Sequence, residues 1–513
     1  MATKQKGSSN GVKQVEAPAN GAPQLEIRNP VTQELIGYVP IHNAEEVRAA
    51  AERARAAQPA WEARSAKERA YMLRCWGDLL WQKRAELMRI IRSETGKNET
   101  GAFLEVYGVH TAALWLYHNA PRILRPQNRM PLIPVIQRAK VYFKPHGVVG
   151  CITPWNYPLY NGFIDLIPAL VAGNSIVVKP SELSPFTTQF CVDLMVQAGI
   201  PKEVVQMVTG DGSTGAAVID NVDYVSFTGS TATGRKVAER AAKRLIQYTL
   251  ELGGKDPMIV LEDANLELAA SGTIRSALEN SGQACVSTER VYVTAPIYDK
   301  YIERLMFYAR QIKIGAGDGF DVDMGSMTHE REVKRVEAHI KDAVEKGAEL
   351  VYGGQRRPDL GPLFIEPTIL TGVTHDMDVM REETFGPVIA IMKVKDADEA
   401  VRMANDSEYG LSGAIFTRNL ARGEQLARML RNGDIGINRT YAVAGSHALP
   451  WGGRKESGLG RRGGPEGLLR YVQPQSILID TTIGAIPGLT LLDTLTFNTL
   501  LVLRVLRRYI PFL

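Results

Sequence analysis

Short apolar runs that alternate with helix-like stretches constrain the fold of this chain more than any other feature of its sequence. The first four runs end at Pro, Gly or Ser, and each leads into a helix-like segment. They lie at 147–152, 175–178, 204–208 and 224–227, and a second series runs from 257–261 to about Gly436. This alternation is typical of βαβ units on a parallel sheet. The 47 glycines suit the many tight turns that such units need.

At 513 residues the chain is too long for one compact core. The apolar series breaks near Gly253 and Gly254, so we predict two α/β lobes divided there. The first lobe takes residues 25–135 and 146–253, and the second takes residues 254–455. The stretch from 44 to 96 is rich in Ala, Glu, Arg and Leu, which indicates helix.

The charge balance and the cysteine count exclude several classes of protein. The formal charge is +4, from 60 basic and 56 acidic residues. Spread over this length, it does not indicate a basic surface for binding nucleic acid. Four cysteines are too few for a disulfide framework, so a reducing, cytoplasmic compartment is expected. No metal site is predicted. Residues 1–24 have no apolar segment and read as a flexible polar arm rather than a secretory signal.

Two segments suggest a nucleotide site. The sequence FTGSTATG at 227–234 closes a strand and opens a helix, where free N–H groups and the helix dipole suit a pyrophosphate. Lys179 and Glu182 follow another apolar run, and a carboxylate there can accept both hydroxyls of an adenosine ribose. Glu182 would repel a 2′-phosphate, which favours NAD over NADP. A simple turn and a solvated Lys and Glu remain the alternatives.

Cys285 and Glu251 are candidates for covalent chemistry. Cys285 stands among small residues in GQACVS, and a reactive thiolate there would need a helix N-terminus or a cation to lower its pKa. Glu251 precedes two glycines, and a carboxylate beside a dry pocket can act as a general base on water. A buried small cysteine and a strand-end glutamate are the alternatives when each is taken alone.

Taken together, these segments resemble the aldehyde dehydrogenase superfamily, the NAD(P)-dependent enzymes that hydrolyse their thioester. The likeness runs from about Leu25 to Ile479. It rests on TPWNYP at 153–158, KPSE at 179–182, FTGSTATG at 227–234, LELGGK at 250–255, GQAC at 282–285, EETFGP at 382–387, PWGG at 450–453 and SGLGR at 457–461. Eight motifs in the family's order are far more specific than any one of them.

The resemblance implies a role for each matched residue. Cys285 would be the nucleophile, Glu251 the general base, and Asn156 the oxyanion donor together with the Cys285 backbone N–H. The adenosine and pyrophosphate of NAD would lie against Trp155, Lys179, Glu182, Gly212, Gly229 and Ser230. Glu383 would hold the nicotinamide ribose, and Phe385 would pack near the nicotinamide.

The resemblance also implies the architecture. We expect an α/β fold with a Rossmann-like NAD-binding domain (the first lobe), an α/β catalytic domain (the second) and a small β oligomerisation arm at 136–145 and 470–482. A homodimer or homotetramer follows from such an arm. Many members carry a second carboxylate shortly after the final Gly-Arg. Pro465 takes that place here and Glu466 follows, so this role stays unassigned.

Several alternatives stay open. A CoA-acylating dehydrogenase would not need Glu251 as a water base, and a thiol hydrolase would need a histidine that no motif contains. A non-enzymatic scaffold on the same fold is the alternative of another class. The substrate is predicted to be a medium- or long-chain, or otherwise apolar, aldehyde. The alternative is succinate semialdehyde, because 458–468 is similar to some succinate-semialdehyde dehydrogenases and Arg439 could meet a distal carboxylate.

The tail at 483–513 lies beyond the family pattern. It is apolar around 500–503, and Arg504, Arg507 and Arg508 follow. Asp493 and Asn498 interrupt the apolar stretch, so a membrane-spanning helix is not expected. Two interpretations remain: a helix packed across a subunit interface, or peripheral contact with the inner face of a membrane, with the arginines toward anionic headgroups.

Overall fold

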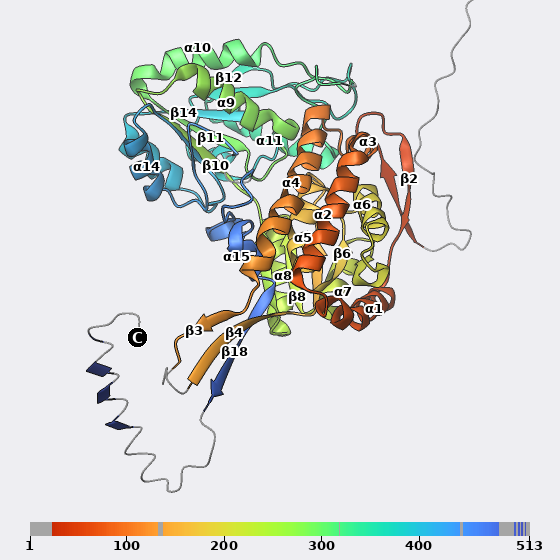
Figure 1. The fold of residues 1–513 in the computed structure, drawn as a ribbon. Helices are drawn as coiled ribbons and strands as arrows, with labels where there is room; N and C mark the ends of the chain where they lie inside the picture. The colour runs from red at the N-terminus through yellow and green to blue at the C-terminus, as the bar shows by residue number, and fades with distance from the viewer. Residues whose placement is uncertain are drawn as a thin grey trace, which may run out of the picture.

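The computed structural model describes residues 23–131, 137–317, 319–441 and 445–481, and the positions 497, 498, 501, 502, 504, 505 and 508. These residues form an α/β molecule with two lobes, each on a largely parallel sheet, and a projecting antiparallel arm (Figure 1). The predicted fold class is confirmed. The polar arm predicted at 1–24 and the tail at 483–513 lie outside the described residues, apart from 23–24 and those isolated positions. The predicted domain boundaries stay a prediction.

The first lobe is built on a six-stranded sheet in the order β17-β9-β8-β5-β6-β7. Five strands are parallel: β5 (Val148–Ile152), β6 (Ser175–Lys179), β7 (Val205–Met207), β8 (Tyr224–Thr228) and β9 (Gln247–Glu251). The edge strand β17 (Gly458–Leu459) comes from far along the chain and runs antiparallel to β9. The strand order reverses between β5 and β8, which is where open α/β sheets bind ligands.

Helices cover both faces of this sheet. One face packs on α1 (Ala44–Glu62), α7 (Gly212–Asn221) and α8 (Thr231–Lys243). The other packs on α2 (Ala66–Gln82), α3 (Arg84–Thr95), α4 (Glu99–Ile123), α5 (Tyr160–Val171) and α6 (Pro185–Gln197), and the short η1 (Lys202–Val204) precedes β7. The predicted helical stretch 44–96 is therefore three helices. Asn43 and Ser65 start the first two with capping boxes to Glu46 and Glu68.

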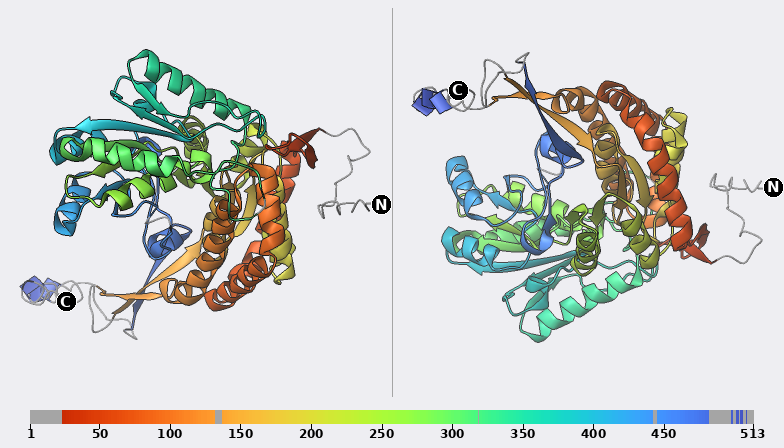
Figure 2. Two further views of the ribbon diagram at one scale, coloured as in Figure 1. Left: turned by 90° about the horizontal axis from the view of Figure 1, so that it is seen from above. Right: turned by 90° about the horizontal axis from the view of Figure 1, so that it is seen from below.

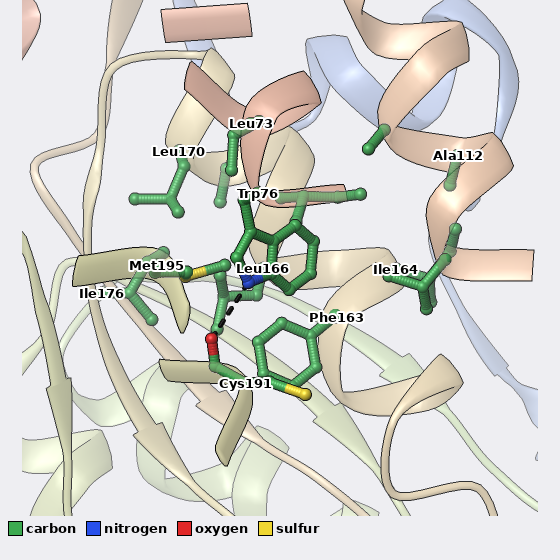
Figure 3. Close-up of a cluster of buried hydrophobic side chains, with 14 of the residues drawn as sticks. Leu73, Trp76, Ala112, Phe163, Ile164, Leu166, Leu170, Ile176, Cys191 and Met195 are labelled. Atoms are coloured by element: carbon green, nitrogen blue, oxygen red, sulfur yellow. Dashed lines mark hydrogen bonds between the residues drawn. The ribbon is translucent and has the colours of Figure 1, made fainter. Parts of the chain in front are cut away.

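The larger core of this lobe lies between α2, α5 and α6. Trp76 and Phe163 are both fully buried, with ring centroids 5.2 Å apart (Figure 3). The indole Nε1–H of Trp76 donates to the backbone carbonyl of Cys191 at 2.9 Å, so the one polar atom of this ring is satisfied inside the core. Cys191 is buried beside these rings as a small apolar side chain.

The second lobe is built on a seven-stranded sheet in the order β12-β13-β14-β11-β10-β15-β16. Six strands are parallel: β10 (Asp256–Val260), β11 (Thr288–Thr294), β13 (Thr368–Thr371), β14 (Val388–Val394), β15 (Ala414–Phe416) and β16 (Gly436–Ile437). The edge strand β12 (Glu349–Tyr352) is antiparallel to β13.

Helices again cover both faces of the second sheet. On one face lie α9 (Leu266–Leu278) and α10 (Tyr298–Ala309). On the other lie α11 (Glu330–Glu345), α12 (Asp378–Arg381), α13 (Ala397–Asn405) and α14 (Leu420–Met429). Two short helices, η2 (Glu279–Gly282) and η3 (Ala295–Ile297), join elements of this lobe. Two more, η4 (Lys455–Ser457) and α15 (Gly464–Leu469), lie on the segment that follows β16.

The arm is a three-stranded antiparallel sheet that projects away from both lobes (Figure 1). Its strands are β3 (Gln127–Arg129), β4 (Gln137–Pro145) and β18 (Val472–Asp480), and β4 pairs with β18 along their whole length. The hairpin of β1 (Gln24–Arg28) and β2 (Leu35–Pro40) lies on the opposite side of the molecule (Figure 2). Among the described helices, none has the length and apolar character needed to cross a membrane.

Candidate active site

Cys285 lies in the loop between η2 and β11, and an unusual backbone holds that loop in place. Asn280, Ser281 and Gly282 all have positive φ, at 51°, 56° and 73°. A Cβ on Gly282 would lie 2.1 Å from the carbonyl oxygen of Gly386, so only glycine fits there. This close approach brings the Cys285 loop against the loop that carries Glu383 and Phe385.

Asn156 is bound to the same loop. Its side-chain Nδ2 donates to the carbonyl of Gln283 at 2.9 Å, and the residue is only 4% exposed. An amide carries two N–H donors, so one remains for another acceptor. Within the part of the chain that the structure describes, the backbone N–H of Cys285 donates to no acceptor. Two donors, one on the Cys285 loop and one bound to it, are therefore free to donate to a developing oxyanion.

Glu251 is the last residue of β9 and is 3% exposed. Neither oxygen of its carboxylate has a hydrogen-bond partner among the described residues. Burial raises the pKa of Glu251 to about 7, against the opposing effect of Arg462 and Arg470. A carboxylate with a pKa near 7 and free lone pairs has the properties of a general base.

The Cys285 thiol does not have the environment that the sequence argument required of a thiolate. Burial raises its pKa to about 12, and the Glu383 carboxylate adds to this effect. The resting thiol is therefore protonated, and its proton has to pass to a base before the sulfur can attack. Glu251, whose pKa is about 7, has the basicity of such a group, and its charge acts on the Cys285 thiol.

The predicted adenosine and pyrophosphate residues gather at the carboxyl edge of the first sheet. Lys179 ends β6, Gly212 begins α7, and Gly229 and Ser230 precede α8. Lys179 is 4% exposed, and its ammonium lies 3.9 Å from the half-exposed carboxylate of Glu182.

This edge of the sheet fits a dinucleotide. Ser230 caps α8 by accepting the N–H of Thr233, and the N–H groups of Thr231 and Ala232 donate to none of the described residues. These free donors at a helix N-terminus suit a pyrophosphate. A Cβ on Gly212 would meet nothing within 4 Å, so space is open beside α7. NAD(P) bound there would be held by Lys179, Glu182 and the first turn of α8.

Trp155, Glu383 and Phe385 lie together at the other end of the nucleotide edge. The rings of Trp155 and Phe385 meet edge to face with centroids 5.5 Å apart. Glu383 Oε1 accepts the backbone N–H of Gly254 at 2.9 Å, and burial raises the pKa of Glu383 to about 8. The structure thus brings Glu383 and Phe385, the predicted nicotinamide residues, next to the Cys285 loop. Trp155, which was predicted for the adenosine and pyrophosphate site, lies with them instead, whereas the other predicted adenosine residues stay at the sheet edge.

A cavity of about 650 Å³ opens at Cys285. Its lining is largely apolar and aromatic, and includes Leu104, Tyr107, Tyr157, Leu268, Phe416 and Tyr441. Polar side chains also line it, among them Arg275, Glu279, Arg439 and His447. Arg275 and Arg439 are exposed, and neither forms a salt bridge with a residue that the structure describes.

Sequence reasoning missed several charged residues that organise this site. Lys97 is fully buried, pairs with Glu105 and donates to the Asn156 carbonyl at 2.8 Å. A signal was present, because Glu105 falls on the apolar face of α4 between Ala102 and Val109.

Two further sets of charges were missed. Lys255 pairs with Glu289, which accepts the N–H groups of Thr384 and Phe385. Asp165 pairs with Arg462 and Arg470, and no pattern in the sequence connects residues so far apart. Glu466, which follows the place expected for a second carboxylate, is exposed.

Comparisons with known proteins agree with this geometry. The model of the aldehyde dehydrogenase family matches residues 17–477. A protein of Mycobacterium ulcerans (strain Agy99), provisionally named succinate-semialdehyde dehydrogenase [NADP(+)] 2, is 42% identical over 465 residues, 90% of each chain. The succinate semialdehyde dehydrogenase of Acinetobacter baylyi is 38% identical and covers 89% of this chain and 94% of its own.

Solved structures give the same family. The betaine aldehyde dehydrogenase of Staphylococcus aureus in complex with NAD+ superposes with a TM-score of 0.87 and 34% identity, and covers 91% of this chain and 94% of its own. An NADP-dependent enzyme of E. coli superposes with a TM-score of 0.86 and 36% identity, and covers 90% of this chain and 95% of its own.

Proposed function

Because the chain belongs to the aldehyde dehydrogenase family, we propose that it oxidises an aldehyde to the carboxylate through a thioester on Cys285. The observation that carries the proposal is the placement of Cys285 at a 650 Å³ cavity, on a loop that offers its own Cys285 N–H and, through the bound Asn156 amide, a second free N–H donor. The family uses NAD(P), and the edge of the first sheet fits such a cofactor.

In the proposed mechanism, each proton and each developing charge is handled by a named residue of the site. Glu251 accepts the proton of the Cys285 thiol, and the sulfur attacks the aldehyde carbon. The oxyanion that forms is bound by Asn156 and by the Cys285 N–H, and each such donor lowers the barrier by about 3–4 kcal/mol. Bound NAD(P) supplies a hydride acceptor. Once the thioester has formed, Glu251 releases the thiol proton to solvent and is a base again. It then takes a proton from water, the hydroxide attacks the thioester carbonyl, and the carboxylate leaves as the Cys285 sulfur is released.

The Glu251→Gln variant tests this mechanism. Because Glu251 also takes the thiol proton, we expect Glu251→Gln to form its first equivalent of NADH per site in a burst slower than that of the parent. Because deacylation needs a water base, turnover should then stall. Stopped-flow absorbance with propanal and NAD measures it, and Glu239→Gln, on the exposed face of α8, is the matched control. Sustained turnover would overturn the proposed role of Glu251. Acceleration by CoA, with acyl-CoA as product, would instead support the CoA-acylating alternative.

For the substrate, we propose succinate semialdehyde. Two exposed guanidinium groups, Arg275 and Arg439, line the cavity that contains Cys285, and a distal carboxylate would pair with them. The names of the Mycobacterium and Acinetobacter relatives support the same compound. Glu279 also lines this cavity and repels an anion, so binding of a substrate carboxylate depends on the two arginines.

A comparison of two four-carbon aldehydes tests the substrate proposal. Succinate semialdehyde and butanal differ in the distal carboxylate. We expect Arg275→Met and Arg439→Met each to lower kcat/KM for succinate semialdehyde about tenfold and to leave butanal unchanged. Arg428→Met, an exposed arginine on α14, is the control. Equal losses on both aldehydes would reject a carboxylate contact.

An apolar aldehyde is the second candidate, and the cavity wall favours it. Tyr107 lines the cavity and is 49% exposed, and its ring lies in a surface cluster with Phe103 and Trp81. A long alkyl chain leaving the cavity would lie over these rings. A kcat/KM that rises steadily from butanal to decanal and exceeds that for succinate semialdehyde would establish this candidate.

For the cofactor, we propose that NAD is preferred over NADP. The half-exposed Glu182 carboxylate lies at the end of β6, where a ribose 2′-phosphate would meet like charge. The names of several relatives specify NADP, so the preference has to be measured on this chain.

We further propose that the arm joins copies of the chain, because β18 is an edge strand with exposed Ile477, Leu478 and Ile479.

A further inference from the structure

Three buried charged residues form a cluster beside the first sheet. Asp165 comes from α5, Arg462 follows β17, and Arg470 follows α15. Arg462 donates to both oxygens of Asp165, at 3.0 and 2.5 Å, and Arg470 donates to Oδ1 of the same carboxylate. The side chains are 1–10% exposed. Two cations share one anion, so the cluster carries one positive charge that Asp165 does not balance.

The cluster lies next to Glu251. Arg462 donates to the hydroxyl of Thr228, and Thr228 is the residue of β8 that pairs with Glu251 across the sheet. The backbone of Arg462 pairs with that of Trp451 through two hydrogen bonds, of 2.8 and 2.7 Å. A Cβ on Gly452, the next residue, would lie 2.9 Å from Glu251 Oε1.

Glu251 needs compensation from its surroundings when it is ionised. It is 3% exposed, and neither of its oxygens has a partner among the described residues. A buried anion without a direct partner is unfavourable unless neighbouring charges offset it. The ionised Glu251 carboxylate supplies the one negative charge that Asp165, Arg462 and Arg470 lack together.

Resting on the proposed role of Glu251 as the water base, we propose that the Asp165–Arg462–Arg470 cluster is a fixed counter-charge that favours the anionic form of Glu251. The cluster would then set the pH at which thioester hydrolysis begins. Its members act through Glu251 and touch no reacting atom, so they are positioning residues.

The other groups that face Glu251 do not remove this excess charge. Arg461 adds a further cation and donates to the carbonyls of Gly453 and Gly460, and the Cys285 thiol is neutral. Although burial acts to raise it, Arg462 and Arg470 hold the pKa of Asp165 at about 2, so Asp165 is ionised. Tyr224 and Tyr471 stay neutral because burial raises the pKa of each.

Four variants in the full-length enzyme separate a role of charge from a role in packing. Arg462→Gln leaves the cluster without net charge and should raise the pKa of Glu251. Asp165→Asn leaves two positive charges and should lower it. The double variant Asp165→Asn/Arg462→Gln restores one positive charge, and Arg462→Lys keeps the charge while it changes the shape.

The readout is the rate at which the Cys285 acyl adduct disappears after the enzyme is mixed rapidly with propanal and NAD. Mass spectrometry of quenched samples gives this rate from pH 5 to 9. We expect the acidic limb of the decay rate to move up by about one pH unit in Arg462→Gln and down by about one unit in Asp165→Asn. The double variant and Arg462→Lys should lie near the parent enzyme. Damage to packing would instead lower the rate at every pH.

Each outcome decides the proposal. Shifts in the same direction for both single variants, or no shift in either, would overturn it. If Glu251→Gln stalls after its burst while the Asp165 and Arg462 variants do not move the acidic limb of the decay rate, only the counter-charge role fails. If Glu251→Gln keeps the parent limb, the proposed base fails as well. Where Arg462→Gln does not fold, Arg470→Gln removes the same charge from the other side of Asp165 and carries the same expectation.

Discussion

At the scale of single residues, the Cys285 thiol is part-buried, and the charges that act on it are three carboxylates, led by Glu383, and the single cation Arg462. Its pKa of about 12 means that the thiolate fraction is very small at neutral pH. A thiol in this state is unreactive toward solvent reagents until a base takes its proton. The arrangement protects the sulfur in the resting enzyme at the cost of a separate proton-transfer step.

The protonated thiol gives a pH prediction. Because thiolate concentration rises tenfold per pH unit below the pKa, iodoacetamide should alkylate Cys285 with a rate that climbs through pH 10 without a plateau. Peptide mass spectrometry follows the modification site by site. Cys285→Ala should abolish aldehyde oxidation, and Cys75→Ala should leave the rate unchanged. A plateau near pH 8, or a tenth of the activity left in Cys285→Ala, would contradict this picture.

Glu182 gives the second prediction at this scale. Removal of its charge in Glu182→Gln should raise kcat/KM with NADP about tenfold and change kcat/KM with NAD little, because the like charge on a 2′-phosphate no longer opposes binding. Steady-state rates with both cofactors measure it. Glu203→Gln, an exposed residue of η1, is the control. Equal rates of the parent enzyme with NAD and NADP would remove the argument.

The residues that carry local chemistry could be predicted from the sequence, whereas their partners could not. Cys285, Asn156 and Glu251 stand in short motifs, and their catalytic roles stay predictions. The partner of Asp165 could not be read, because Arg462 is 297 positions away. The pKa of Cys285 was also out of reach, since it depends on burial and on Glu383.

At the scale of elements, two buried lysine–glutamate pairs each hold one loop of the site. Glu105, paired with Lys97, accepts the consecutive N–H groups of Leu159 and Tyr160. Glu289, paired with Lys255, does the same for Thr384 and Phe385. In each pair the carboxylate fixes a loop backbone and the lysine neutralises the carboxylate. Loops that carry function are thus fixed from the core side.

The Lys97 pair gives a prediction for the loop that carries Asn156. Lys97→Met leaves the Glu105 carboxylate buried without a cation, which should destabilise the lobe by roughly 3–5 kcal/mol. The thermal midpoint should fall, and kcat should fall with it as Asn156 loses its anchor. The double variant Lys97→Met/Glu105→Gln should recover most of the midpoint, because no charge is left unpaired. A double variant less stable than Lys97→Met alone would show that the pair does not act as a unit.

Strand positions were predictable to within one or two residues. The apolar runs at 175–178 and 224–227 are β6 (Ser175–Lys179) and β8 (Tyr224–Thr228), because a fully buried parallel strand must be apolar on both faces. The two-residue strand β17 was not predictable. Its sequence, Gly-Leu, carries no strand pattern, and only its contact with β9 makes it a strand.

At the scale of the whole molecule, the arm presents an unpaired strand edge with three exposed apolar side chains. Ile477, Leu478 and Ile479 are 39%, 57% and 44% exposed on β18. An edge of this kind in a soluble protein is normally covered. The resemblance predicted the arm as a segment, whereas the sequence alone did not show that β4 and β18 pair over nine residues each.

Leu478→Asp tests assembly through the arm. A charge at the centre of the exposed strand should weaken pairing between copies, so light scattering after size exclusion should show a smaller particle than the parent. Leu245→Asp, at a leucine that is 94% exposed elsewhere on the surface, is the control. A parent enzyme that is already monomeric at micromolar concentration would refute the proposal.

The long span between Asp165 and its two arginines also orders events during synthesis. The ribosome completes the five parallel strands of the first sheet long before it reaches β17, Arg462 or Arg470. Until then the Asp165 carboxylate has no cation beside it, and burying it alone would be unfavourable. Closure of the nascent first lobe on its own is therefore disfavoured, although N-terminal domains commonly fold as they emerge. We expect a chain halted before residue 458 to stay sensitive to protease in this lobe, and release of the last segment to act as the trigger for closure.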